Sequence, residues 1–170
     1  MGTKTCLFFY GMGVLFHASS YSTVYWEVTG YDDYHSGLWE ACRDGVCSFT
    51  TNHLCFFEAT QVLETLALVT GSLGLLLLIF YFYISKTSFD LSLCIASLIA
   101  VSFSACCAIL AVIIYGCKTS LPVSWSYALA VVGGICFGIT TILLAVYVMN
   151  NSDKYTNYRN SRQGDIQHYV

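Results

Sequence analysis

The sequence predicts an all-helical membrane protein of four transmembrane helices, with short β-strands in one extracellular loop. Of the 170 residues, 56% are hydrophobic and 10% are charged, and the mean hydropathy is +0.65. A soluble domain carries about a quarter charged residues. Three segments, 62–84, 91–115 and 124–148, are each long enough to cross a hydrocarbon core of about 30 Å, and Glu64 is their only charged residue.

Residues 5–25 form a weaker hydrophobic segment that fits two interpretations. Lys4, an apolar run and the small residues 18–20 are typical of a secretory signal peptide with its cleavage site. In a transmembrane helix, His17 and the following serines would face the other helices, and aromatic residues would lie at the membrane interface. We favour the helix, which gives spans over about 5–25, 62–84, 91–115 and 124–148.

The basic residues predict the orientation of these spans. One side has Lys4, Lys86, Lys154, Arg159 and Arg162, and the other side has Arg43 and Lys118. Because positively charged residues favour the cytoplasmic side, we expect both termini inside and the loops 26–58 and 117–123 outside. The polar tail, 150–170, has the composition of a disordered segment.

The first outer loop contains a predicted hairpin. Asp44-Gly45 is a strong signal for a two-residue turn, since both central positions need a positive φ. That turn places Cys42 opposite Cys47, on a side of the membrane where disulfides persist. We therefore predict a disulfide between them, and strands over 26–29, 34–42 and 46–51, which are rich in aromatic and β-branched residues.

The same loop is acidic. Between residues 26 and 58 it has one basic residue, Arg43, and six acidic residues: Glu27, Asp32, Asp33, Glu40, Asp44 and Glu58. Such a surface attracts cations if it lines a narrow path. The alternative is an ordinary solvated face.

Small residues repeat along two of the helices. The third has Ala96, Ala100, Ser104 and Ala108 at every fourth position, and the fourth has Gly134 and Gly138. In lipid, such stripes allow helix backbones to approach closely. We expect packing within the bundle, with self-association or a partner's helix as the alternative.

The sequence contains no catalytic motif. It has no nucleophile elbow, phosphate-binding loop or metal-ligand spacing of histidines. We therefore expect no enzyme, no cofactor, no metal site and no nucleic-acid binding. His17 is expected to be a hydrogen-bonded structural histidine, and Glu64, one turn into its helix, is expected to extend toward the outer interface.

The chain ends in His168, Tyr169 and Val170. PDZ domains bind such ends as an added strand, with the carboxylate held by backbone amides and the last side chain in a pocket. A PDZ scaffold is therefore an expected partner, alongside membrane lipid.

Taken together, these residues resemble the signature of the claudin superfamily. Trp26 is followed by Gly37-Leu38-Trp39, Cys42 and Cys47. Glu58-Ala59-Thr60-Gln61 is similar to the family's opening of the second helix, and the Tyr-Val ending is similar to that of many claudins. The short spacings and Gln61 look more like the peripheral myelin protein and epithelial membrane protein branch, so the subfamily stays open.

The resemblance implies a left-handed four-helix bundle with a small antiparallel sheet outside, in the plasma membrane at cell–cell junctions. It implies adhesion or a paracellular barrier, with Trp39 anchoring the sheet to the bilayer surface and Asp32 and Asp33 as candidates for charge selection. Other branches imply alternatives: an auxiliary subunit of an ion channel or receptor, or an organiser of membrane domains. Self-association or another integral membrane protein is accordingly an expected partner.

Overall fold

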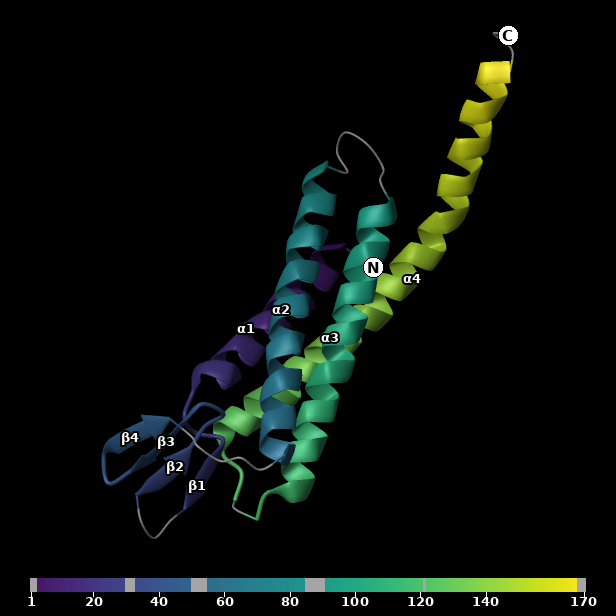
Figure 1. Ribbon diagram of the computed structural model, residues 1–170. Coiled ribbons are helices and arrows are strands. Elements are labelled where there is room, and N and C mark those ends of the chain that lie inside the picture. The colour runs from purple at the N-terminus through teal and green to yellow at the C-terminus, as the bar shows by residue number, and fades with distance from the viewer. Residues whose placement is uncertain (1–2, 30–32, 50–54, 85–90, 121, 168–170) are drawn as a thin grey trace.

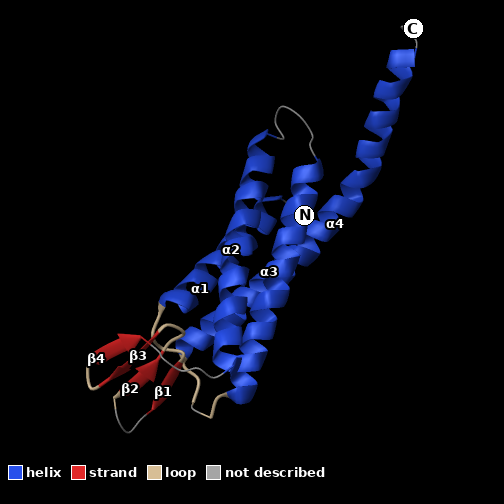
Figure 2. Ribbon diagram, viewed as in Figure 1, coloured by secondary structure: helices blue, strands red, loops and turns tan. Residues whose placement is uncertain are grey.

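The computed structural model describes residues 3–29, 33–49, 55–84, 91–120 and 122–167. Within these ranges the elements are α1 (Thr3–Ser22), β1 (Glu27–Thr29), β2 (Tyr34–Ser36), β3 (Glu40–Arg43), β4 (Val46–Phe49), α2 (Cys55–Ile84), α3 (Leu91–Lys118) and α4 (Trp125–Gln167). The helices lie side by side, and the strands gather beyond one end of them (Figure 1). Figure 2 shows the same separation of helices from strands by colour.

The four helices form a bundle whose buried residues make two hydrophobic clusters, one within the helices and one at the end that carries the sheet. Helix α1 packs against α4 and α2, α2 packs against α3, and α3 packs against α4. Large apolar side chains fill the centre, and the rings of Tyr10 and Phe137 meet edge to face with centroids 6.0 Å apart. The predicted arrangement of four packed helices is therefore present.

Three of the described helices are long and apolar enough to cross a membrane. They are Cys55–Tyr83, Ser92–Lys118 and Trp125–Asn151. Their outward side chains are apolar, as the exposed series Val62, Leu66, Val69, Leu73 and Leu76 on α2 shows. This pattern fits a membrane protein, because water would disfavour such a stripe and lipid would not. Helix α1 is not among the three, so its crossing of the membrane stays a prediction.

The four strands form one antiparallel sheet in the order β1-β2-β3-β4. The predicted strands over 26–29 and 46–51 correspond to β1 and β4, whereas the predicted strand over 34–42 is two strands, β2 and β3. The single long strand was wrong because the chain reverses at residues 37–39. There the backbone N–H of Gly37 donates a 2.8 Å hydrogen bond to the carbonyl oxygen of Glu40.

Two helix boundaries differ from the sequence prediction by more than one helical turn. Helix α2 begins at Cys55 rather than at residue 62, because the first turn buries Phe57 beneath the sheet. Helix α4 continues through the predicted disordered tail to Gln167 and extends well beyond the bundle (Figure 1). Among its described residues the tail lacks proline, and the Asn151 amide donates a 2.8 Å hydrogen bond to the carbonyl oxygen of Tyr147, one turn earlier.

Candidate functional site

The hairpin β3–β4 forms as the sequence predicts. Asp44 and Gly45 have φ angles of 52° and 77°, which are the two positive values that a type I′ turn requires. This turn pairs Arg43 with Val46 and Cys42 with Cys47. The disulfide between Cys42 and Cys47 is present, with their α-carbons 4.0 Å apart.

Trp26 fastens the sheet to the end of α1. Its side chain is fully buried, and its indole N–H donates a 2.9 Å hydrogen bond to the carbonyl oxygen of Ser20. Its backbone N–H donates a 2.8 Å bond to the carbonyl oxygen of Ser36, at the end of β2. The indole also meets the ring of Tyr115 edge to face, with centroids 5.0 Å apart. One residue thus joins α1, the sheet and α3.

The turn at residues 37–39 fastens the sheet to α2. Leu38 is fully buried, and its carbonyl oxygen accepts a 2.6 Å hydrogen bond from the Gln61 side chain. A β-carbon added at Gly37 would lie 2.7 Å from the α-carbon of Val24 and closer still to the carbonyl oxygen of Thr23. Only glycine fits this contact, since backbone atoms cannot move aside as a flexible side chain can.

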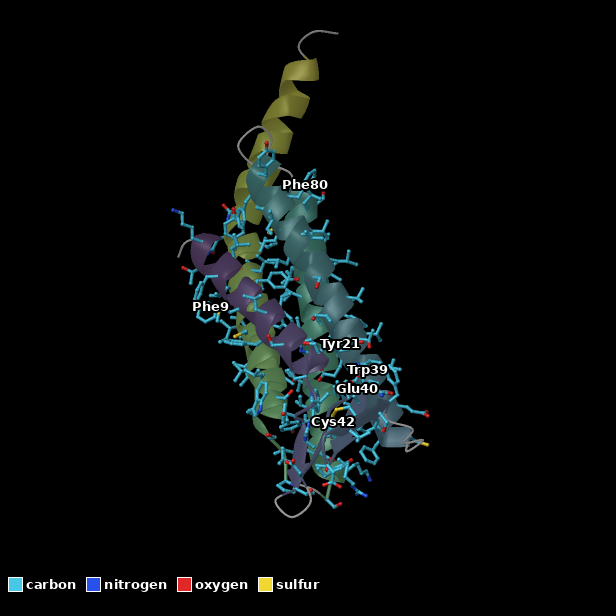
Figure 3. All side chains as sticks on the ribbon, turned by 90° about the vertical axis from the view of Figure 1, so that its left-hand side faces the viewer. Phe9, Tyr21, Trp39, Glu40, Cys42 and Phe80 are labelled. Atoms are coloured by element: carbon cyan, nitrogen blue, oxygen red, sulfur yellow. A yellow bond between two sulfur atoms is a disulfide. The ribbon has the colours of Figure 1, made fainter. Side chains whose placement is uncertain are left out.

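Trp39 lies at the boundary between the bundle and the sheet. Its ring meets the ring of Tyr21, from the last turn of α1, with centroids 5.4 Å apart, and it remains 38% exposed. Figure 3 shows Tyr21, Trp39 and Cys42 following one another from α1 into the sheet, while Phe80 lies toward the opposite end of the molecule. This boundary position agrees with the expected interfacial role of Trp39 and does not test it.

The two edges of the sheet differ. The β1 edge is closed by the segment before α4: Glu27 pairs with Val123, and the backbone N–H of Ser124 donates a 2.8 Å hydrogen bond to the carbonyl oxygen of Trp26. The β4 edge has no strand beside it among the described residues. All four β4 residues are exposed, including Val46 at 74% and Phe49 at 78%. An open edge with apolar side chains is a surface that can pair with another chain.

The acidic residues of the loop between α1 and α2 have different environments. Asp33 and Asp44 are exposed, whereas Glu27 is half-buried and accepts a hydrogen bond from the Thr119 hydroxyl. Asp32 lies outside the described residues. Charge selection by Asp32 and Asp33 therefore stays a prediction.

The predicted small-residue stripes lie largely inside the bundle. The Ser104 hydroxyl donates a 2.6 Å hydrogen bond to the carbonyl oxygen of Ala67 on α2. An added β-carbon at Gly74 would lie 2.9 Å from that of Ala100, and one at Gly134 would lie 3.5 Å from that of Ala108. Ala96, at the start of the stripe, is half-buried.

Gly138 differs from the prediction of packing within the bundle. No described atom lies within 4 Å of a β-carbon added there, so this position leaves open space on α4. Among the cysteines within the helices, Cys106 is exposed, while Cys94, Cys107 and Cys136 are buried. Gly138 itself is half-buried, so the open space lies beside a position that the bundle covers only in part.

Glu64 does not extend to the outer interface, so that prediction was wrong. Its side chain is fully buried, with one carboxylate oxygen 2.8 Å from Nε2 of a fully buried His17. Burial is favourable only because the imidazole supplies the opposite charge or a hydrogen bond. The signal in the sequence was one histidine in the predicted span 5–25 and one glutamate in the predicted span 62–84, neither of which has another charged residue. His17 is hydrogen-bonded, as expected, since Nε2 also lies 3.3 Å from the carbonyl oxygen of Glu64.

The remaining predicted sites can be placed only in part. His168, Tyr169 and Val170 lie outside the described residues. Within the described ranges, no three His, Cys, Asp or Glu side chains are grouped so that they could hold a metal ion. The site that the structure assembles is instead the four-stranded sheet, fastened to α1 through Trp26 and to α2 through Gln61, with the β4 edge open.

No model of a known protein family matches this chain, and no curated protein matches it either.

Proposed function

We propose that this chain is a claudin-like membrane protein of cell–cell junctions that adheres through its outer sheet. The observation that carries the proposal is the open β4 edge on a sheet that is otherwise fixed in place. Trp26 and Gln61 attach the sheet to two helices, and the Cys42–Cys47 bridge closes the hairpin that includes the edge. A rigid edge loses little conformational entropy when it pairs with another molecule.

The chemistry of β4 favours a protein partner on this edge. Unpaired backbone groups along an edge strand bind an added strand through main-chain hydrogen bonds. Val46 and Phe49 expose apolar surface beside those groups, and burying it would add to the affinity. In the proposed orientation the edge faces the extracellular space, where a neighbouring cell or a neighbouring molecule can supply the partner.

The residues of the claudin-like signature have structural roles that support the proposal. Trp26 and Leu38 are fully buried, Gly37 allows the close approach to Thr23 and Val24, and Cys42 and Cys47 form the bridge. The first three residues hold the sheet against the bundle, and the bridge holds β3 to β4. In the proposed function, the tail binds a PDZ scaffold through residues 168–170 on the cytoplasmic side.

The test is to express the chain, tagged ahead of Gln167, in cells that lack junctional strands, and to mix these with untransfected cells. Enrichment only where two expressing cells touch would support adhesion between copies. V46S/F49S should abolish that enrichment while surface levels stay normal, and S48A on the same strand is the matched control. Uniform surface signal for the parent protein would contradict the proposal.

One observation favours the second candidate, an auxiliary subunit of a channel or receptor. The space beside Gly138 is unused by the bundle, and a small residue facing open space on an apolar helix admits a partner's transmembrane helix. Such a subunit would spread evenly or remain internal until its partner is present. The same imaging experiment therefore separates the two functions.

A further inference from the structure

His17 and Glu64 form an isolated polar pair inside the bundle. His17 Nε2 lies 2.8 Å from Glu64 Oε2, and both side chains are fully buried. His17 Nδ1 and Glu64 Oε1 have no hydrogen-bond partner among the described residues. The imidazole and the carboxylate therefore make their main polar contact with each other. This contact connects α1 to α2.

The surroundings of the pair are apolar and closely packed. The ring of Phe137 on α4 lies 5.7 Å from the ring of His17, and a β-carbon added at Gly133 would lie 3.3 Å from the His17 β-carbon. Among the described residues, the ion pair with each other is the only one that either side chain forms.

The other ionisable groups on the neighbouring helices are phenols and thiols. Tyr127 on α4 is in electrostatic contact with Glu64, and the Tyr21 hydroxyl lies 3.1 Å from that of Thr65, next to Glu64. The ring of Tyr10 on α1 meets the ring of Phe137. Cys136 directly precedes Phe137 on α4. Helix α3 has no charged residue before Lys118, at its outer end. Phenols and thiols are ordinarily uncharged near neutral pH, so none of these groups balances the pair.

The pair is electrically neutral only when it holds one proton. That proton can reside on the imidazole, with the carboxylate ionised, or on the carboxylate, with the imidazole neutral. Loss of the proton leaves a net negative charge, and a second proton leaves a net positive charge. Either charge would be buried without compensation, which is strongly unfavourable. The contact between α1 and α2 is therefore most stable with one proton.

Each partner lies one helical turn from a residue that fastens the sheet. His17 precedes Ser20, whose carbonyl oxygen accepts the hydrogen bond from Trp26. Glu64 follows Gln61, whose side chain donates to the carbonyl oxygen of Leu38. Residues three apart lie on the same face of a helix. A separation of α1 from α2 at the pair would consequently move the two attachment points apart.

We propose that His17 and Glu64 form a one-proton latch that holds the sheet in place, and that a change in its proton number loosens the attachment of the sheet through Trp26. On acidification a solvent proton bonds to the pair, giving imidazolium beside a neutral carboxyl group. On alkalinisation the shared proton leaves to solvent, giving neutral imidazole beside a carboxylate. The proposal depends on the burial of the pair and not on the adhesive function.

The test uses tryptophan fluorescence of the purified full chain in nanodiscs. The chain has three tryptophans, so W39F/W125F leaves Trp26 as the only reporter, and its full burial gives a blue-shifted emission. Between pH 4 and pH 9 the emission of this protein should shift to the red at one or both limits. The same protein with H17Q/E64Q should show no shift, because two amides retain hydrogen bonding but do not titrate.

Two further measurements make the result decisive. H17E/E64H exchanges the partners, keeps a one-proton pair and should retain the shift. If H17Q/E64Q does not fold, loss of the shift in folded H17E/E64H overturns the proposal. E27Q removes the carboxylate of the residue that follows Trp26 in the chain and should leave the shift unchanged. The proposal is overturned if the emission of the W39F/W125F protein is constant between pH 4 and pH 9. It is also overturned if folded H17Q/E64Q keeps the same shift.

Discussion

The side-chain amide of Gln61 donates a 2.6 Å hydrogen bond to the carbonyl oxygen of Leu38, which joins the second turn of α2 to the tight turn between β2 and β3. Leu38 itself is fully buried, so water cannot easily replace this donor. The sheet therefore depends on a single side chain for its attachment to α2 at this point, and on Trp26 for its attachment to α1.

Replacing Gln61 with leucine should destabilise the protein by about 1–3 kcal/mol, because the Leu38 carbonyl oxygen would lose its partner in a buried place. The loss of stability would be measured as a lower midpoint of thermal unfolding in detergent. A thiol-reactive dye that labels the buried cysteines as they become exposed would follow the unfolding. V62L, at the next and 58% exposed position, is the matched control and should leave the midpoint unchanged. Equal midpoints for Q61L and the parent would show that the bond contributes nothing.

Removing the disulfide should weaken the hairpin. C42S/C47S is expected to cost about 2–4 kcal/mol, since a bridge restricts the unfolded chain, and to reduce delivery to the cell surface. Surface biotinylation measures the second effect. C55S/C117S removes two exposed free cysteines instead and should behave as the parent. Normal surface levels of C42S/C47S would mean that the bridge is dispensable.

Alanine substitutions at Gly37 and Gly11 compare a closely packed glycine with one that has open space beside it. G37A brings a β-carbon to 2.7 Å from the Val24 α-carbon, a backbone contact that should cost about 3 kcal/mol as overpacking does. G11A meets no described atom within 4 Å and should stabilise α1 by about 0.5–1 kcal/mol, because alanine favours a helix. The two unfolding midpoints should therefore move in opposite directions. A shift of the same sign and size would contradict the close approach at Gly37.

The tail prediction concerns residues outside the described ranges. Deleting Tyr169 and Val170 should abolish capture by an isolated PDZ domain, because the terminal carboxylate and apolar side chain would be displaced. The unfolding midpoint should not change. A pull-down of equal strength after the deletion would show that any scaffold binds elsewhere.

Local patterns predicted the helices and the hairpin well. The dipeptide Asp44-Gly45 is sufficient to specify the hairpin turn. The register that follows from this turn places Cys42 opposite Cys47. The apolar segments likewise form helices α2, α3 and α4, since their length and hydropathy are properties of the segment alone.

Features that depend on contacts between residues far apart in the sequence could not be predicted in this way. Leu38 looked like part of a strand, and only its burial against the bundle and its bond to Gln61 explain the reversal there. Glu64 lies one turn inside its predicted helix, and its position near the end suggested exposure. Its burial follows from the approach of His17 across the bundle, which no pattern within α2 can indicate.

The two small-residue positions on α4 distinguish packing within the bundle from binding to a partner. At Gly134 an added β-carbon would lie 3.5 Å from that of Ala108, so G134L should force α3 and α4 apart and lower the unfolding midpoint, as overpacking costs about 1–3 kcal/mol. G138L enters open space and should leave the midpoint unchanged. If a partner's helix occupies that space, G138L should nevertheless abolish co-purification of the partner from native membranes. Retained co-purification by a stable G138L protein would exclude this face of α4 as the docking surface.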